Sequence, residues 1–248
     1  MPIVPARRRT TSTAMRNSAG TIMDRSELYR VMSWLSPAYP VGAFSYSHGL
    51  EWLVETGAIS DAATLQCWLG DILIRGSGRN DAILFAHAHG AVLYGNLKAL
   101  CEVAEYANAL AASAERRLET NAQGAAFSEI TCKTWGSPSL AQLLSLYPKT
   151  ISYPVAVAAA AADHGVALAP ALEAYIHAFT ANLVSAGVRL IPLGHTAGQR
   201  VLMQLESAVA DTVAQGLAGN LSQLSNITIM AEIAAMKHET QYTRLFRS

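Results

Sequence analysis

Histidines and serines are the residues of this chain that could support metal binding or catalysis, but their spacing favours neither chemistry. The nearest histidine pair, His87 and His89, would point about 160° apart on the helix expected there, so both could not reach one metal ion. No H-x-x-x-H or H-E-x-x-H pattern occurs, although histidines of two copies could converge at a symmetric interface. No sequence rule makes Ser45, Ser47 and His48 a triad, so hydroxyls that stabilise a turn are the better interpretation. We predict no catalytic residue and no metal site within one chain.

Nucleotide-binding and nucleophile signatures are absent from the sequence as well. It contains no G-x-x-x-x-G-K-[ST], no G-x-G-x-x-G after a strand and no G-x-S-x-G. Cys67, Cys101 and Cys132 are odd in number and widely spaced, which argues against a disulfide framework or a structural zinc site and suits a reducing cytoplasm. We therefore expect the chemistry that this protein serves to be carried by its partners.

Composition points to a helical protein that covers part of its surface with other proteins. Of the 248 residues, 51% are hydrophobic and only 15% are charged, whereas about a quarter is usual. Residues 1–23 carry four of the 18 basic residues and no acidic one, which leaves 14 basic against 18 acidic residues elsewhere. The sequence shows no basic surface that could neutralise a row of phosphates, so nucleic acid is not an expected partner. No apolar run reaches the roughly 18 residues of a membrane span, so a membrane is not expected either.

Residues 36–53, SPAYPVGAFSYSHGLEWL, differ from the helical patterns on either side, and we call them the Pro/Gly loop. Pro37 and Pro40 exclude a helix interior and bias the residues before them towards extended conformations. Gly42 and Gly49 allow backbone conformations that other residues resist. The aromatic and polar side chains between them indicate either a well-packed turn between two helices or a recognition surface.

The C-terminal residues 238–248, HETQYTRLFRS, are the second unusual segment. A polar C-terminus normally frays, but Tyr242, Leu245 and Phe246 are too apolar for a purely solvated one. Because aromatic and arginine side chains are enriched in interface hot spots, docking onto a partner is one interpretation. Packing of Leu245 and Phe246 within the chain is the other.

Helical periodicity accounts for most of the remaining sequence, and no segment alternates like a strand. Asp24 and Glu27 form a predicted capping box, followed by an apolar face of Leu28, Val31, Met32 and Leu35. Further helices are predicted through Glu55 to Gly57, from Ser60 or Asp61 to Gly76, from Asn80 or Asp81, from Leu97 to Trp135 with a break near residues 112 and 113, from Pro138 to Leu146, over residues 155–163 as a buried central helix, from Pro170, from Gly198 or Gln199 through Val213, and from about Met230. Residues 216–228 are predicted to be irregular.

These patterns predict an all-α fold of about ten helices in a single domain, residues 24–248. Residues 1–23 are predicted to be a disordered basic extension, or a product of an upstream start codon with Met23 as the true start. Glu115, Arg116 and Glu119 have helical contact spacings, which favours a solvated face, with a partner contact as the alternative.

Three motifs, in order, resemble the urease accessory protein UreF family, over roughly residues 26–248. They are PVGAFSYSHGLE (Pro40 to Glu51), RLIPLGHTAGQR (Arg189 to Arg200) and MKHETQYTRLFRS (Met236 to Ser248). One departure is His195, where the family often has Gln in PLGQ, which leaves the role of that position open.

The resemblance implies a cytoplasmic, homodimeric accessory protein for nickel insertion into urease. It would bind UreD (also called UreH), and the complex would recruit the GTPase UreG and apo-urease and regulate UreG in a GAP-like or checkpoint role. No cofactor would be bound tightly by this chain, since nickel would be handled by the assembled complex. A stand-alone helical nickel-binding protein or metal-dependent enzyme is the alternative.

The motif residues that we expect to bind partners come from all three motifs. They are Tyr46, His48, Glu51, Arg189, Arg200, His238, Glu239, Tyr242, Arg244, Leu245 and Phe246. Arg189, Arg200 and Arg244 are candidates either for an arginine finger or for ordering the switch loops of the GTPase. Scaffolding is the favoured role, because nothing in the sequence places one of them on a rigid, exposed loop.

Overall fold

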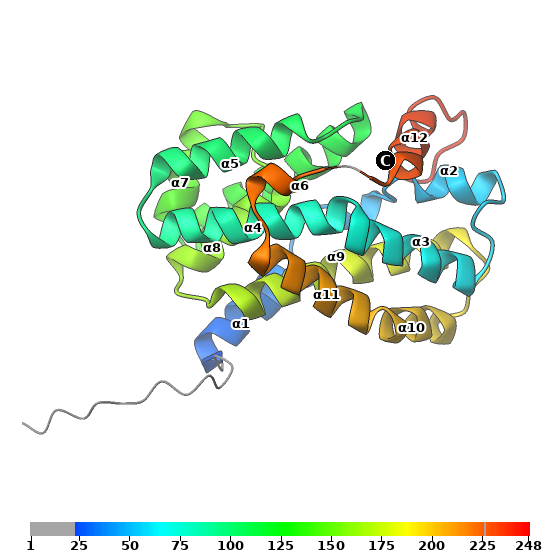
Figure 1. The fold of residues 1–248 in the computed structure, drawn as a ribbon, viewed down its shortest axis with the longest axis horizontal. Helices are drawn as coiled ribbons and strands as arrows, with labels where there is room; N and C mark the ends of the chain where they lie inside the picture. Colours follow the sequence, from blue (N-terminus) through cyan, green and yellow to red (C-terminus); the bar gives the residue numbers. More distant parts are fainter. Residues whose placement is uncertain (1–22, 226) are drawn as a thin grey trace, which may run out of the picture.

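The computed structural model describes residues 23–225 and 227–248, and these residues form helices with no strand among them. The prediction of an all-α fold is confirmed. Figure 1 shows the arrangement of the helices. The elements are α1 (Arg25–Trp34), η1 (Ala43–Ser45), α2 (Leu50–Glu55), α3 (Ala62–Arg75), α4 (Ser77–Leu93), α5 (Leu97–Ala109), α6 (Ala114–Thr134), α7 (Pro138–Leu146), α8 (Tyr153–Asp163), α9 (Leu168–Leu190), α10 (His195–Gln204), α11 (Glu206–Ala218), η2 (Leu221–Gln223) and α12 (Ile229–His238).

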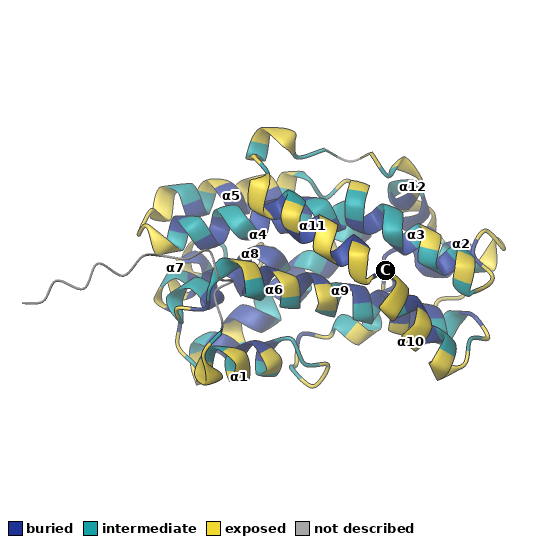
Figure 2. Cartoon of the chain, turned by 60° about the horizontal axis from the view of Figure 1, so that its bottom comes forward, coloured by how far each residue is buried: buried dark blue, intermediate teal, exposed yellow. Residues whose placement is uncertain are grey.

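The alanine-rich helix α8 lies in the middle of the bundle, as its sequence predicts. All residues from Pro154 to Ala161 are buried (Figure 2), and α4, α6, α7 and α9 pack around the helix. Small side chains let neighbouring helices approach closely. At Gly124 of α6 the approach is extreme, because a Cβ atom there would lie 1.9 Å from the main-chain oxygen of Ile151.

Most predicted helix ends are confirmed, and the structure shows the interactions that fix them. The Asp24 carboxylate accepts the backbone N–H groups of Ser26 and Glu27, and the Glu27 side chain completes the capping box. Asp61 caps α3 in the same way. The predicted break near residues 112 and 113 is real, since the Ser113 side chain caps α6.

Two local predictions are wrong, and in both of them glycine was a misleading signal. Helix α4 begins at Ser77 rather than at Asn80 or Asp81, because Gly76 alone separates it from α3. The helix that was expected to run unbroken to Val213 divides into α10 and α11 at Leu205, and α11 continues through Gly216. That glycine serves close packing instead of a break, since a Cβ there would lie 2.6 Å from the Cβ of Ala82 in α4.

The first predicted helix is confirmed as α1. Val31 is buried, but Leu28 and Met32 are 48% and 66% exposed, so only part of the predicted face reaches the core. The predicted disorder of the N-terminal extension lies outside the described residues, apart from Met23, which packs against the core. Within the described residues, every helix is too short or too polar to span a lipid bilayer.

Candidate functional site

The first and third sequence motifs meet at one end of the bundle, where Arg189 of the second motif also lies. The Pro/Gly loop runs into α2, which packs against α12, and α12 also packs against α6 (Figure 1). The residues that follow α12, 239–248, fold back over this region, and we call them the tail. The tail, the loop and the first turns of α6 together form the tail-docking site.

Glu51 of α2 is the main acceptor for the tail. Its carboxylate accepts the backbone N–H of Leu245 at 2.6 Å and that of Phe246 at 2.9 Å. The side chain of His238 approaches the same carboxylate, with Nε2 2.9 Å from Oε2. Glu51 is 8% exposed, so these hydrogen bonds replace the water that an ionised carboxylate requires.

His238 joins two carboxylates that would otherwise repel each other. Its Nδ1 lies 2.7 Å from Oε2 of Glu115, opposite the contact with Glu51, and the ring is fully buried. An ionised carboxylate can only accept hydrogen bonds. This geometry therefore requires either that both ring nitrogens of His238 carry a proton or that one of the two glutamates is protonated. Arg244 of the tail donates to the other oxygen of Glu115 at 2.9 Å. Burial raises the pKa of Glu115 despite the nearby His238 and Arg244.

A second buried cluster joins the Pro/Gly loop to α6. Arg116 donates to Oε2 of Glu119 at 2.6 Å and to Nδ1 of His48. Burial and the Arg116 guanidinium both lower the pKa of His48, which favours a neutral ring whose Nε2–H donates to Ser77 Oγ at 2.7 Å. Burial alone would raise the pKa of Glu119, but Arg116 and His48 outweigh burial and lower that pKa to about 2.

The backbone of the Pro/Gly loop is shaped to receive both α12 and the tail. Gly49 has a φ of 77°, and a Cβ on it would lie 2.8 Å from the backbone nitrogen of Ala235 in α12. His48, with a φ of 62°, also occupies the left-handed region, which costs about 1–3 kcal/mol for a residue with a side chain. The backbone N–H of Ser47 donates to the main-chain oxygen of Ser248 at 2.6 Å, and that of Arg247 to Ser45 at 2.8 Å.

Arg189, at the end of α9, stacks between two aromatic rings. Its guanidinium carbon lies 3.6 Å from the ring centre of Phe44 in the loop and 4.3 Å from that of Phe246 in the tail. Phe246 is 3% exposed, so this stacking and burial anchor the tail through a side chain as well as through the backbone. Arg189 thus connects the second sequence motif to the first and the third.

The predicted partner-binding residues divide into an inner and an outer group. Tyr46, His48, Glu51, His238 and Phe246 are buried inside the tail-docking site, where they position other residues of this chain. Glu239, Tyr242, Arg244 and Leu245 are exposed on the tail side, and the Glu239 carboxylate also accepts the backbone N–H of Ala114 at 2.9 Å. Arg189 stacks between the loop and the tail, and Arg200 is exposed on α10, outside the described contacts of the site. Partner binding by either group stays a prediction.

The sequence interpretation of α6 as a solvated face is wrong. Glu115 and Glu119 are each 6% exposed, because the tail and the Pro/Gly loop cover them. Two glutamates four residues apart, in a chain with few charges, were a possible sign of a buried cluster. The spacing could not show which distant segments supply the positively charged side chains. Internal packing of Phe246 is what the structure shows, while Leu245 is 67% exposed.

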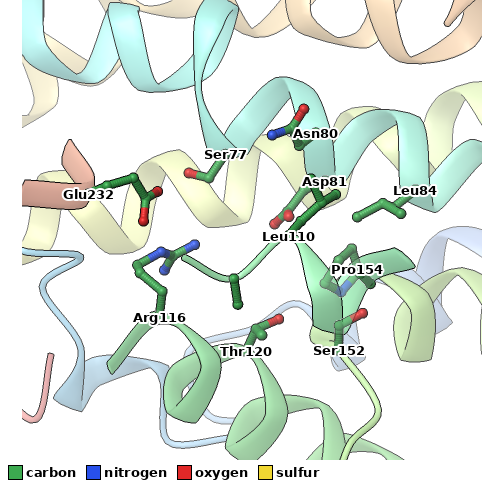
Figure 3. Close-up of a pocket in the computed structure, with 12 residues that line it drawn as sticks. Ser77, Asn80, Asp81, Leu84, Leu110, Arg116, Thr120, Ser152, Pro154 and Glu232 are labelled. Atoms are coloured by element: carbon green, nitrogen blue, oxygen red, sulfur yellow. The ribbon is translucent and has the colours of Figure 1, made fainter. Parts of the chain in front are cut away.

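Asp81 of α4 is a buried titratable group that the sequence interpretation missed. It faces a cavity of about 40 Å³ that is also lined by Arg116 of α6, Ser152 and Glu232 of α12 (Figure 3). Burial raises the pKa of Asp81 to about 6, even though Arg116 lies nearby and the Tyr175 hydroxyl donates to it at 2.9 Å. The cavity exceeds the roughly 10–15 Å³ that one water molecule needs.

No arrangement for metal binding is found in the described part of the chain. Among residues 23–225 and 227–248, no three His, Cys, Asp or Glu side chains lie together in a way that could hold a metal ion. His87 and His89 instead approach the main-chain oxygens of Gly219, at 3.2 Å, and Val166, at 2.8 Å.

These features define an all-helical protein whose distinctive site is a docked tail with outward-facing aromatic and arginine side chains, an arrangement suited to protein contacts. Comparison with known proteins gives the family. Residues 59–206 match the family model UreF. The chain is 49% identical to the urease accessory protein UreF of Bradyrhizobium sp. strain BTAi1, over 94% of this chain and 96% of that protein. It is 51% identical to the protein of the same name from Rhodopseudomonas palustris strain HaA2, over 90% of this chain and 94% of that protein.

The chain therefore belongs to the UreF family of urease accessory proteins. Its role is accessory rather than catalytic.

Proposed function

We propose that this protein serves nickel insertion into urease by binding UreD (UreH), and that the resulting complex recruits UreG and apo-urease. The observation that carries the proposal is the docked tail. It holds Tyr242 103% exposed and Leu245 67% exposed while Phe246 beside them is buried. Large apolar side chains held outwards on an anchored segment have lost much of their conformational freedom before a partner arrives, which favours binding.

Helix α12 extends this apolar surface. Ile229, Met230 and Met236 are 66%, 53% and 45% exposed, and α12 leads directly into the tail. Exposed apolar side chains gathered on one element and its continuation are typical of protein interaction sites. We propose α12 and the tail as the partner-binding surface, with a homodimer and a cytoplasmic location as further parts of the proposal.

The positions of Arg189 and Arg244, two of the three candidate arginines, favour scaffolding over an arginine finger. Arg189 is stacked between two rings, and Arg244 is tied to Glu115 with its side chain 41% exposed. A finger has to reach into another protein's nucleotide site, which would require either side chain to give up its contacts. Regulation of UreG through ordering of its switch loops therefore fits this chain better, with nickel handled by the assembled complex.

Co-purification with UreD, UreG, GTP and magnesium tests the proposal. The informative variants are a chain that ends at Glu239, which keeps His238 between its two carboxylates, and Tyr242→Ala. Tyr94→Ala is the matched control, because Tyr94 is 84% exposed at the end of α4. We expect the first two variants to lose the complex and the control to keep it, with circular dichroism unchanged in all three. If the variant that ends at Glu239 assembled fully, the tail would not be part of the partner-binding surface.

The stand-alone nickel-binding protein remains the second candidate, and calorimetric nickel titration of the isolated chain separates the two. Stoichiometric, tight binding by the monomer would favour the second candidate. Weak binding together with assembly of the complex would favour the first.

A further inference from the structure

Glu51, His238 and Glu115 form a buried triad at the last residue of α12, where the chain becomes the tail. Both ring nitrogens of His238 face a carboxylate oxygen, at 2.9 Å from Glu51 and at 2.7 Å from Glu115. His238 is fully buried and the two glutamates are 8% and 6% exposed, so solvent contributes little to either contact. A ring nitrogen without a proton would turn its lone pair towards an ionised carboxylate, and the two would repel each other. The triad therefore needs one proton more than a neutral histidine between two ionised glutamates carries.

The same proton balances the charge of the site. Arg244 of the tail adds one positive charge, 2.9 Å from Glu115. With the extra proton, two carboxylates, one imidazolium and one guanidinium sum to zero, and a neutral imidazole beside one protonated glutamate gives the same sum. Without it, the site keeps one uncompensated negative charge, which is costly to bury. The count does not depend on which group carries the proton, because such a cluster titrates as a unit.

The tail is the segment that keeps water from these two carboxylates. The backbone N–H groups of Leu245 and Phe246 occupy both oxygens of Glu51, and Arg244 occupies the second oxygen of Glu115. When the tail leaves, water can hydrate both glutamates, and the uncompensated charge is then tolerated. An exposed histidine releases its proton near pH 6.5. Above this pH the undocked state therefore binds fewer protons than the docked state.

Charged groups around the triad either keep one charge state near neutral pH or favour the proton. Burial alone would raise the pKa of Glu119, but Arg116 and His48 lower it to about 2. Burial and Arg116 lower the pKa of His48. Burial raises the pKa of Glu115, and the charge of Glu239 adds to that effect. Further charged side chains on α2, the start of α6, α12 and the tail are Glu55, Arg117, Glu232, Lys237 and Arg247.

We propose that docking of the tail takes up one proton, held by the triad of Glu51, His238 and Glu115, so that the tail is released as pH rises above neutral. The sign follows from the proton counts: the docked state binds more protons, so rising pH favours the undocked state. This inference concerns the chain alone and does not rest on the proposed function. If the tail also binds partners, the same proton controls how firmly that surface is held.

Amide hydrogen exchange of the full chain between pH 7 and pH 8.5 tests the proposal. The protection of the Leu245 and Phe246 amides, corrected for the intrinsic rate at each pH, reports the docked population. We expect this protection to fall about fivefold to thirtyfold across the range, the higher figure being the limit for one proton. The amide of Ala158 in α8 is the internal control for the bundle and should keep its protection.

Glu115→Gln tests whether the triad holds the proton. The amide resembles the protonated carboxyl, because its NH₂ group can donate to Nδ1 of His238 while its oxygen accepts from Arg244. We expect the tail protection of this variant to stay within about twofold from pH 7 to pH 8.5 and to exceed that of wild type at pH 8.5. Glu129→Gln removes a carboxylate from the same helix, in an exposed pair with Lys133, and should keep the wild-type pH dependence.

His238→Gln decides the question if Glu115→Gln does not fold. Its side chain does not titrate, so tail protection should be independent of pH and at least about threefold below wild type at pH 7. Wild-type protection that changes by less than about twofold across the range would overturn the proposal. So would a full wild-type pH dependence in either variant, or a folded Glu115→Gln chain without tail protection at pH 7.

Discussion

Glu51 shows how one carboxylate can fasten a segment almost two hundred residues further along the chain. Two backbone N–H groups and one imidazole converge on it, and hydrogen bonds to an ionised acceptor are about twice as strong as neutral ones. The resemblance marked Glu51, His238 and Phe246 as site residues, and the structure places all three in one cluster. The sequence did not show that they contact each other, because each contact depends on the path of the tail.

Replacing Glu51 with glutamine tests this arrangement. The amide offers one acceptor oxygen and turns a donor towards the tail, so at least one of the N–H groups of Leu245 and Phe246 loses its partner. We expect tail docking to weaken by about 1–3 kcal/mol. The amide hydrogens of these two residues should then exchange about 10- to 100-fold faster. Exchange at the wild-type rate would exclude Glu51 as the main acceptor; Glu102→Gln, in an exposed ion pair of α5, is the control.

Asp81 predicts an unusual pH dependence of stability. Its pKa is about 6 in the folded chain against an ordinary 3.8, so between these values the folded carboxyl holds its proton while the unfolded one releases it. The raised pKa therefore lowers the free energy of unfolding as pH rises through this window, by about 1.4 kcal/mol per pH unit and about 3 kcal/mol in total. Below pH 3.8 the raised pKa does not lower the free energy of unfolding, and above about pH 6 the loss of stability stays constant.

Asp81→Asn should remove that cost, because the amide cannot ionise and its oxygen can still accept from Tyr175. We expect urea unfolding to show the variant up to about 3 kcal/mol more stable than wild type at pH 7.5 and nearly equal at pH 4. Asp71→Asn, at a carboxylate that is 50% exposed beside Arg75, is the control and should change stability by less than about 1 kcal/mol. A variant less stable than wild type at pH 7.5 would contradict the argument.

At the scale of elements, the sequence predicts what depends on local interactions. Asp24, Asp61 and Ser113 mark helix starts because their side chains bond to the backbone a few residues away. Glycine is ambiguous in the same sequence: Gly57 follows the end of α2 with a positive φ, whereas Gly216 lies within α11 against α4. The choice between a break and a close contact depends on the neighbouring helix, which local patterns do not contain.

Two helical glycines provide a matched test of close packing. Gly124→Ala would place a Cβ 1.9 Å from the main-chain oxygen of Ile151, while nothing lies within 4 Å of the equivalent atom at Gly90 of α4. We expect Gly124→Ala to destabilise the fold by about 3 kcal/mol or more and Gly90→Ala to stabilise it by about 0.5–1 kcal/mol. Chemical denaturation measures both, and a mild effect at Gly124 would show that α6 can move away from Ile151, in the segment that precedes α8.

Across the whole molecule, the least predictable feature is the burial of charge at the tail-docking site. Glu115, Arg116 and Glu119 have the spacing of a solvated helical face, but the tail and the Pro/Gly loop cover them. The helices themselves follow from periodicity, so the all-α fold was predictable. The site was not, because it forms only where distant segments meet, with contacts that span from 68 residues, between His48 and Arg116, to 201 residues, between Ser47 and Ser248.

The final prediction concerns whether the tail and the helical bundle unfold together. Helices α4, α6, α8 and α9 pack against one another, and Phe246 is the one described tail residue that belongs to the buried hydrophobic core, so a chain that ends at Glu239 should keep its far-ultraviolet circular dichroism. It loses the burial of Phe246 and the contacts of Arg244 and Ser248 with Glu115 and Glu119. We expect its free energy of unfolding to fall by about 2–5 kcal/mol, with a nearly unchanged urea m-value.

That combination would mean that the tail can leave its site without unfolding the bundle, so a partner protein could compete for it at a modest free-energy cost. A truncated chain with lost helicity or a much lower m-value would instead make the tail part of the core, and the partner surface would then have to form around a tail that never detaches.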